Sequence, residues 1–213
     1  GSKSRSRSRS RSRPNDLRIL TPVLSWGSYL TAFMHTSGWT HYVGIDVMPS
    51  VCEKVKFLAN YYHSLPQTEQ NKKVELYCQP SEALAQDKNF LKKYEEYFDL
   101  VLICPPYYDM EIYHEGQQSI DTYPSYEEWL EKYWYQTCKL AFETLQSKGT
   151  YAVIMNDYFS LQGDHFPLTK DLTDQAIRAG FKLDRFYYLF NRTSPLRVNK
   201  KERTERLSIF IKP

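Results

Sequence analysis

The stretch Asp99–Tyr108 reads Asp-Leu-Val-Leu-Ile-Cys-Pro-Pro-Tyr-Tyr, and the fold prediction starts from it. Its aliphatic half, Leu100–Ile103, is typical of a strand that is buried on both faces of a parallel sheet. The two prolines that follow remove two amide donors and stiffen the chain, which leaves carbonyl groups pointing outward beside an aromatic side chain. This combination indicates a functional site at the carboxyl end of a buried strand.

Around this stretch, apolar runs alternate with amphipathic segments, a pattern typical of repeated βα units. The expected strands are Leu17–Leu20, His41–Asp46, Val74–Cys78, Phe98–Cys104 and Thr150–Asn156. The expected helices are Tyr29–Thr36, Pro49–Tyr61, Asp87–Tyr97 and Tyr126–Leu145. Pro49 suits a first helical turn, and Ser125 suits an N-cap. We therefore predict an α/β fold with a doubly wound parallel sheet.

The C-terminal segment has a different pattern. A helix is expected near Leu168–Ala179, followed by strands at Phe181–Phe190 and Glu205–Ile211. Their connection is too short for a helical crossover, so this last pair of strands is predicted to be antiparallel. The predicted sheet has five parallel strands closed by this antiparallel pair. The connecting loop projects positive charge from one edge of the sheet through Arg192, Arg197, Lys200, Lys201 and Arg203.

Charge is distributed unevenly along the 213 residues, although the formal net charge is only +3. Residues 1–13 carry a charge of +6, residues 178–213 carry +7, and residues 14–177 carry −10. Basic ends on an acidic body indicate a polyanionic partner that is met at both ends of the chain.

Ser4–Arg13 is a strict Ser-Arg repeat with no apolar side chain to bury. It cannot offset the entropy of ordering, so we predict a disordered basic tail at residues 1–14 and one domain at residues 15–213. One interpretation of the tail is a nucleic-acid-binding arm that phosphorylation of its serines would switch off. The other is a solubilising or artificially added tail, since the opening Gly-Ser is typical of an expression remnant.

Composition excludes several classes of protein. No apolar run approaches the ~18–20 residues of a membrane span, and there is no signal-peptide pattern. The four cysteines form no CxxC pair, and the five histidines have no metal-ligand spacing, so neither a disulfide framework nor a metal site is expected. The prediction is an intracellular protein of a reducing compartment, in cytoplasm, nucleus or virion.

Two further strand ends carry candidate site residues. The first expected strand runs into a tight turn that contains Ser25-Trp26-Gly27, and the second ends in Asp46, whose carboxylate suits two ribose hydroxyls. Together with Cys104-Pro105-Pro106-Tyr107, this series resembles the class I S-adenosylmethionine-dependent methyltransferases. It looks most like the DNA amino-methyltransferases that modify adenine N6 or cytosine N4. Residues 109–130 are similar to a phage and large-virus branch of that family, and the whole likeness covers roughly residues 17–211.

The resemblance implies a Rossmann-like methyltransferase sheet and S-adenosylmethionine as cofactor. Ser25, Trp26 and Gly27 would lie under the methionine part, Asp46 would bind the ribose, Met48 would lie beside the adenine, and Ser81 and Glu82 would meet the adenine edge.

The resemblance also implies that Cys104, Pro105, Pro106 and Tyr107 hold the target base. Tyr107 would stack on a base taken out of its helix, and Tyr108 and Tyr113 are further candidates for base stacking. Glu111 would either orient the motif or lie in solvent. The implied partner is nucleic acid, with DNA favoured over RNA. Because the chain leaves little room for a recognition domain, a protein partner could supply target recognition.

Two departures from the family pattern keep alternatives open. The family usually has an acid where this chain has Thr21, and Asp, Asn or Ser where it has Cys104, whose thiol is a weak acceptor. The first hypothesis is an active amino-methyltransferase. The second is a catalytically decayed fold that serves as a nucleic-acid-binding, virion or partner subunit. A third, less favoured, makes the Cys104 thiolate a nucleophile towards a pyrimidine ring, as in cytosine C5 methylation.

Overall fold

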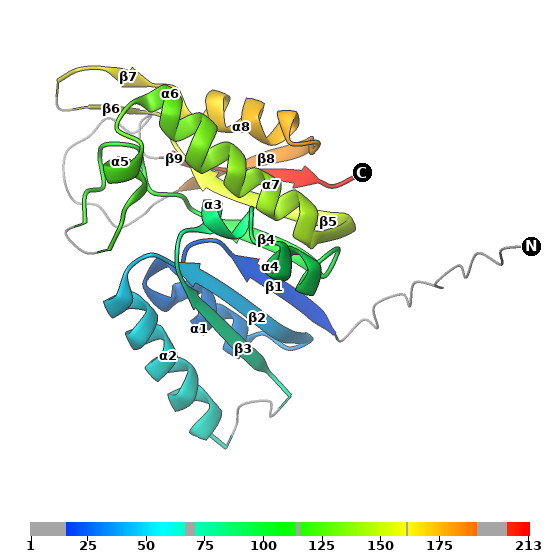
Figure 1. Ribbon diagram of the computed structural model, residues 1–213. Helices are drawn as coiled ribbons and strands as arrows, with labels where there is room; N and C mark the ends of the chain where they lie inside the picture. Colours follow the sequence, from blue (N-terminus) through cyan, green and yellow to red (C-terminus); the bar gives the residue numbers. More distant parts are fainter. Residues whose placement is uncertain (1–15, 67–70, 114–115, 161, 191–203) are drawn as a thin grey trace, which may run out of the picture.

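The structure is a computed structural model that describes residues 16–66, 71–113, 116–160, 162–190 and 204–213. At its centre lies a seven-stranded sheet with the order β3-β2-β1-β4-β5-β9-β8 (Figure 1). The predicted Ser-Arg tail lies outside the described residues, as do Arg192, Arg197, Lys200, Lys201 and Arg203.

Five strands of the sheet are parallel: β1 (Leu17–Thr21), β2 (Trp39–Asp46), β3 (Lys73–Cys78), β4 (Phe98–Ile103) and β5 (Leu145–Met155). β9 (Thr204–Ile211) runs antiparallel to both of its neighbours, β5 and β8 (Lys182–Phe190). The predicted five parallel strands and the antiparallel terminal pair are confirmed. Because β9 is inserted between β5 and β8, β8 points in the same direction as the five parallel strands.

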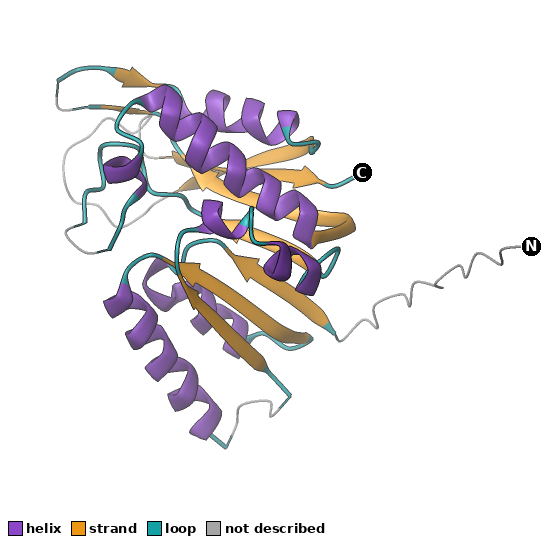
Figure 2. Ribbon diagram, viewed as in Figure 1, coloured by secondary structure: helices purple, strands orange, loops and turns teal. Residues whose placement is uncertain are grey.

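Helices lie on both sides of the sheet (Figure 2). α1 (Ser28–His35) and α2 (Pro49–Ser64) bury their apolar residues on one face, against side chains such as Tyr42. The other face packs against α3 (Ser81–Leu84), α4 (Lys88–Lys93) and α8 (Leu168–Arg178), together with the long helix described next. Pro49 lies in the first turn of α2, as predicted.

The expected helix Tyr126–Leu145 is one continuous helix of three parts: α6 (Tyr126–Glu128), a π-helical stretch η2 (Trp129–Trp134) and α7 (Tyr135–Thr144). The Ser125 hydroxyl accepts from the backbone N–H of Glu128 at 3.2 Å, which confirms Ser125 as the N-cap. A π-helical stretch inside a helix is rare and is often found at functional sites.

Five short elements were not predicted: η1 (Ser25–Gly27), α3, α5 (Ser119–Thr122), and the two-stranded ribbon of β6 (Tyr158–Phe159) and β7 (His165–Phe166). The expected helix Asp87–Tyr97 is shorter than predicted. Asp87 is its N-cap, accepting from two backbone N–H groups, and Glu96 has a φ of 47°, which a helix cannot continue through.

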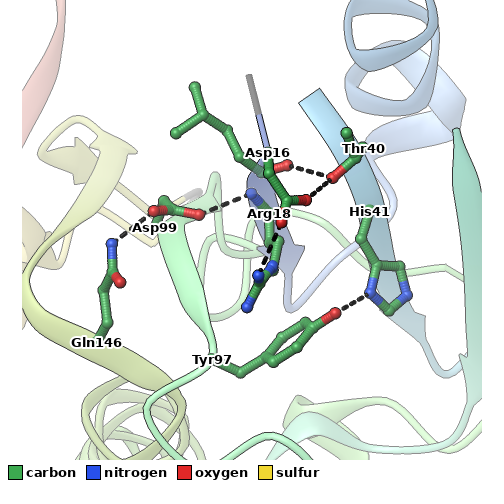
Figure 3. A network of polar contacts seen from close by, with 8 residues as sticks. Asp16, Arg18, Thr40, His41, Tyr97, Asp99 and Gln146 are labelled. Carbon is green, nitrogen blue, oxygen red and sulfur yellow. Dashed lines mark hydrogen bonds and ion pairs between the residues drawn. The ribbon is translucent and has the colours of Figure 1, made fainter. Parts of the chain in front are cut away.

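Polar contacts hold the sheet together at the edge where β1, β2 and β4 begin (Figure 3). The backbone N–H of Arg18 donates to the Asp99 carboxylate at 2.8 Å, and the Thr40 hydroxyl donates to Asp16 at 2.5 Å. His41 Nδ1 and the Tyr97 hydroxyl are 2.8 Å apart. This network tethers the strands at one edge and leaves the opposite edge, where the same strands end, for a ligand.

Candidate functional site

A cavity of about 270 Å³ lies at the carboxyl ends of β1, β2 and β4. The strand order reverses between β1 and β4, and ligands of open α/β sheets bind outside the strand ends at such a reversal. The volume is near the lower end of the ~300–1,000 Å³ typical of small-molecule pockets. Ten of the predicted site residues line this cavity: Ser25, Trp26, Asp46, Met48, Ser81, Glu82, Cys104, Pro106, Tyr108 and Tyr113.

The turn after β1 has an unusual backbone. Ser25, Trp26 and Gly27 have φ angles of 47°, 55° and 88°, so three successive residues adopt a left-handed conformation. For Ser and Trp this conformation costs free energy, and such strain gathers at ligand sites. Gly27 lies outside the cavity lining: a side chain there would approach Leu58 of α2 to 3.2 Å. Its role in the structure is to let the turn pack on α2 and start α1.

Asp46, at the end of β2, is held by backbone groups. One carboxylate oxygen accepts from the N–H of Leu24 at 3.1 Å, and the other accepts from the N–H of Met48 at 3.0 Å. These two bonds fix the carboxylate at the cavity wall. A carboxylate is an acceptor suited to ligand hydroxyls.

Three polar side chains meet at the wall formed by α3 and η2. Glu82 is only 7% exposed, and burial raises the pKa of its carboxyl to about 6. The Ser81 hydroxyl is 3.0 Å from the Thr137 hydroxyl. The hydroxyl of Tyr133 is buried and has no hydrogen-bond partner among the described residues, although its side chain lines the cavity. Buried tyrosine hydroxyls normally find a partner, so this one suits a bound ligand that has a polar edge.

Cys104 follows β4 on the same cavity wall. Burial and the nearby charges of Glu205 and Glu111 raise the pKa of its thiol to about 12. The thiol therefore stays protonated near neutral pH. Thr21, where an acid was expected, is fully buried, and its hydroxyl is 2.6 Å from the hydroxyl of Tyr42. The Thr21 side chain thus belongs to the core between the sheet and α1.

Pro105 and Tyr107 lie outside the cavity lining as far as the described residues define it. The Tyr107 ring is 8% exposed and packs edge-to-face against Tyr158 of β6 at 5.6 Å. Tyr107 is thus a packing residue of the 158–166 ribbon in this structure. Tyr108 lines the cavity and also packs against Trp129, with its hydroxyl donating to the Pro124 carbonyl.

The segment after the Pro-Pro motif folds back over the cavity. Tyr113 packs edge-to-face against Trp26 at 5.7 Å, and its hydroxyl donates to Glu111 at 2.8 Å. Gly116 has a φ of 76°, and a Cβ there would lie 2.5 Å from the Val47 carbonyl oxygen. This close approach brings the backbone of the segment directly against the chain that follows β2.

Tyr133 was not among the predicted site residues, because its helical spacing within the expected helix Tyr126–Leu145 predicts packing against the sheet. Gln79, Gln118 and Ser119 also line the cavity and were not predicted. Helical spacing correctly indicated that the Tyr133 ring is buried, but it carries no information on where the hydroxyl points. The Gln118 side chain accepts from the backbone N–H of Tyr113 and donates to its carbonyl. These bonds fix the segment after the Pro-Pro motif, which we call the covering segment.

Across the described ranges, no three His, Cys, Asp or Glu side chains are grouped so as to hold a metal ion. Within the same ranges no helix is both long enough and apolar enough to cross a membrane.

No known protein family profile matches this chain, and no curated protein matches it by sequence. Solved structures do match by fold. A SAM-dependent methyltransferase from Methanosarcina mazei has 15% identity and a TM-score of 0.56, covering 93% of both chains. An S-adenosylmethionine-dependent methyltransferase from Listeria monocytogenes has 12% identity and a TM-score of 0.58, covering 93% of this chain and 91% of that one.

A third structure, from Bordetella parapertussis and described as a possible exported protein, has 15% identity and a TM-score of 0.55. The match covers 94% of this chain but spans only 63% of the Bordetella protein. At such identities the likeness concerns the fold. The chain has the Rossmann-like α/β fold that these S-adenosylmethionine-dependent methyltransferases share.

Proposed function

We propose that this protein is an S-adenosylmethionine-dependent methyltransferase that acts on an exocyclic amine of a nucleic-acid base. One observation carries the proposal: side chains that follow four separate strands line a single cavity. They are the expected cofactor residues Ser25, Trp26, Asp46, Met48, Ser81 and Glu82, and Cys104 and Pro106 of the Cys-Pro-Pro-Tyr motif. A transferase for a methyl group needs its two substrates in one water-excluding site, with the reacting atoms aligned.

The donor set of the cavity fits the cofactor. Asp46 offers a fixed carboxylate for ribose hydroxyls, and the hydroxyl of Tyr133 offers a hydrogen bond to a polar edge such as that of adenine. Glu82 and Ser81 lie on the same wall. When bound, the cofactor supplies an electrophilic methyl group on sulfur.

At the base end, the chemistry needs acceptors for the protons of the target amine. The amine is a poor nucleophile because its lone pair is delocalised into the ring. Glu111 lines the cavity, and its charge helps to raise the pKa of Cys104, so the two side chains are neighbours. We propose that the Glu111 carboxylate takes the acceptor role that a Cys104 thiol fills only weakly.

The acidity of Cys104 also argues against a thiolate nucleophile. With a pKa of about 12, the thiol is almost entirely protonated near neutral pH, whereas attack on a pyrimidine ring requires the thiolate. Trp26 and Tyr113, which line the cavity and pack on each other, are the aromatic side chains that we propose contact the base.

Calorimetry with S-adenosylmethionine tests the cofactor half of the proposal. We expect binding by the wild type and a loss of at least ~10-fold in affinity for Asp46→Ala, which removes a charge-assisted contact. Asp46→Asn removes the charge but keeps the size of the side chain. A loss of affinity in this variant too would show that the effect of Asp46→Ala does not come from misfolding. Asp174→Ala, an exposed acid on α8, serves as the matched control. No binding by the wild type at millimolar cofactor would exclude the proposed activity.

Transfer of a labelled methyl group to DNA and RNA, each as single strand and duplex, tests the substrate half. We expect Glu111→Gln to lower the transfer rate while cofactor affinity stays near the wild-type value. Cys104→Asn restores a stronger acceptor and should raise the rate. Cofactor binding without transfer to any of these substrates would leave a binding protein, not this enzyme.

A further inference from the structure

β8 is an edge strand, since among the described strands it pairs only with β9. Residues 182–188 are exposed without interruption, whereas a strand that covers a core buries every second side chain. Two aromatics on one face are included, Phe186 with 46% exposure and Tyr188 with 57%. Tyr187, which is 49% exposed, lies on the opposite face. A group of large apolar side chains held in water on a regular element marks an interaction surface.

A cation accompanies the two rings. The guanidinium of Arg206, on β9, lies 4.7 Å from the ring centroid of Phe186. Phe186 and Tyr188, two residues apart on the same face of the strand, pack edge-to-face at 5.6 Å. Lys182 and Arg185 pair with Ile211 and Ile209 and so lie on the opposite face of the strand, where Arg185 is paired with Asp184 at 2.5 Å. An exposed pair of rings beside an arginine fits single-stranded nucleic acid, in which unpaired bases stack on the rings and the cation meets phosphates.

The end of β8 lies on the same side of the sheet as the cavity. β8 is parallel to β4, so both strands end at the same edge of the sheet. Leu189, the residue after Tyr188, pairs with Glu205, whose charge contributes to the raised pKa of Cys104. Three strand spacings of ~4.8 Å separate β4 from β8, about 14 Å in all.

We propose that Phe186 and Tyr188 of β8, together with Arg206, bind single-stranded nucleic acid that flanks the target base. This inference rests on the proposed function, because it takes the nucleic acid in the cavity to continue along the sheet edge. Stacking requires bases whose faces are free, so the surface prefers single strands over duplex. This surface would also bind part of the substrate outside the cavity.

The test is the fluorescence anisotropy of a labelled single-stranded oligothymidylate of about 12 nucleotides, without cofactor, and of a duplex of the same length. Phe186→Ala/Tyr188→Ala removes two rings. At ~1–3 kcal/mol per stacked base, the dissociation constant for the single strand should rise about 25-fold or more. Phe186→Leu/Tyr188→Leu keeps two apolar side chains in the strand and should show a similar loss if stacking is the cause. The matched control, Phe57→Ala/Tyr61→Ala, removes two exposed aromatics of α2 and should bind as the wild type does.

Unchanged binding by both β8 variants, or an equal loss in the α2 control, would overturn the inference. Light scattering provides a second check: a wild-type dimer that the β8 variants dissociate would make this surface an interface between copies of the chain. The outcome is separable from that of the proposed function. Single-strand binding that depends on β8, with no methyl transfer to any substrate, would support this surface and refute the enzyme. Methyl transfer, together with unchanged single-strand binding by the β8 variants, would support the enzyme and refute this surface.

Discussion

Glu82→Gln should stabilise this protein at neutral pH while weakening its ligand binding. Glu82 lies in the first turn of α3, is 7% exposed and lines the cavity. Burial raises the pKa of its carboxyl from 4.5 to about 6, and hydrogen bonds from its own backbone N–H and from Ser81 only partly oppose the rise. A neutral amide of the same size avoids the cost of burying this charge.

The magnitude follows from linkage. A pKa difference of about 1.5 between the folded and unfolded states is equivalent to about 2 kcal/mol, at ~1.36 kcal/mol per unit of pKa. Below pH 4.5 the carboxyl is protonated in both states, and the full stability is present. As the pH rises from 4.5 to about 6, the unfolded chain gives up its proton first, so the free energy of unfolding falls by about 2 kcal/mol. Above that range the loss is complete.

Urea unfolding of the wild type and Glu82→Gln at several pH values from 4.5 to about 7 measures this effect. The variant should gain about 2 kcal/mol on the wild type across the range, because all other titrating groups are shared. Glu127→Gln, at an exposed position of α6, reports the effect of removing a surface carboxylate. If the free energies of unfolding of the wild type and Glu82→Gln differed by the same amount at every pH, the reasoning would be refuted. S-adenosylmethionine should bind the stabilised variant more weakly, since a group kept for function often costs stability.

Two substitutions and one labelling experiment probe the cavity. Gly116→Ala should weaken cofactor binding with little change in urea midpoint, because a Cβ at this φ of 76° meets the Val47 carbonyl and displaces only the covering segment; a wild-type calorimetric affinity would contradict this. Tyr133→Phe should leave stability within ~1 kcal/mol of the wild type, since the hydroxyl has no partner in the described structure, but should lower cofactor affinity. Cys104 should react slowly with a thiol reagent near neutral pH because its pKa is about 12, and mass spectrometry should find exposed Cys78 labelled first.

The order of strands and helices was predictable because each element has its own local pattern. The run Leu100–Ile103 is a buried strand, and Pro49 and Ser125 begin helices, as their chemistry requires. The antiparallel ending also followed from the length of one connection. The η1 turn was not predictable, because the residue types Ser and Trp do not indicate that both residues have positive φ angles.

The site was predictable to a smaller degree. The ends of parallel strands must meet at one edge of a sheet, so Asp46 and Cys104 could be expected near each other. Which way an aromatic side chain turns is decided by packing between distant segments. Tyr107, the last residue of the Cys-Pro-Pro-Tyr motif, packs against Tyr158 and lies outside the cavity lining, while Tyr133, 26 residues further along the chain, lines the cavity.

The sequence alone determined the fold class, the five parallel strands with their antiparallel terminal pair, and the strand ends that carry chemistry, because hydrophobic periodicity and turn residues act over a few positions. Only the tertiary structure decided that Glu82 is buried, that Cys104 remains a protonated thiol and that Phe186, Tyr187 and Tyr188 stand in water. These are properties of the surroundings of a side chain. Such surroundings are made by segments far apart in sequence, whose contacts no local pattern records.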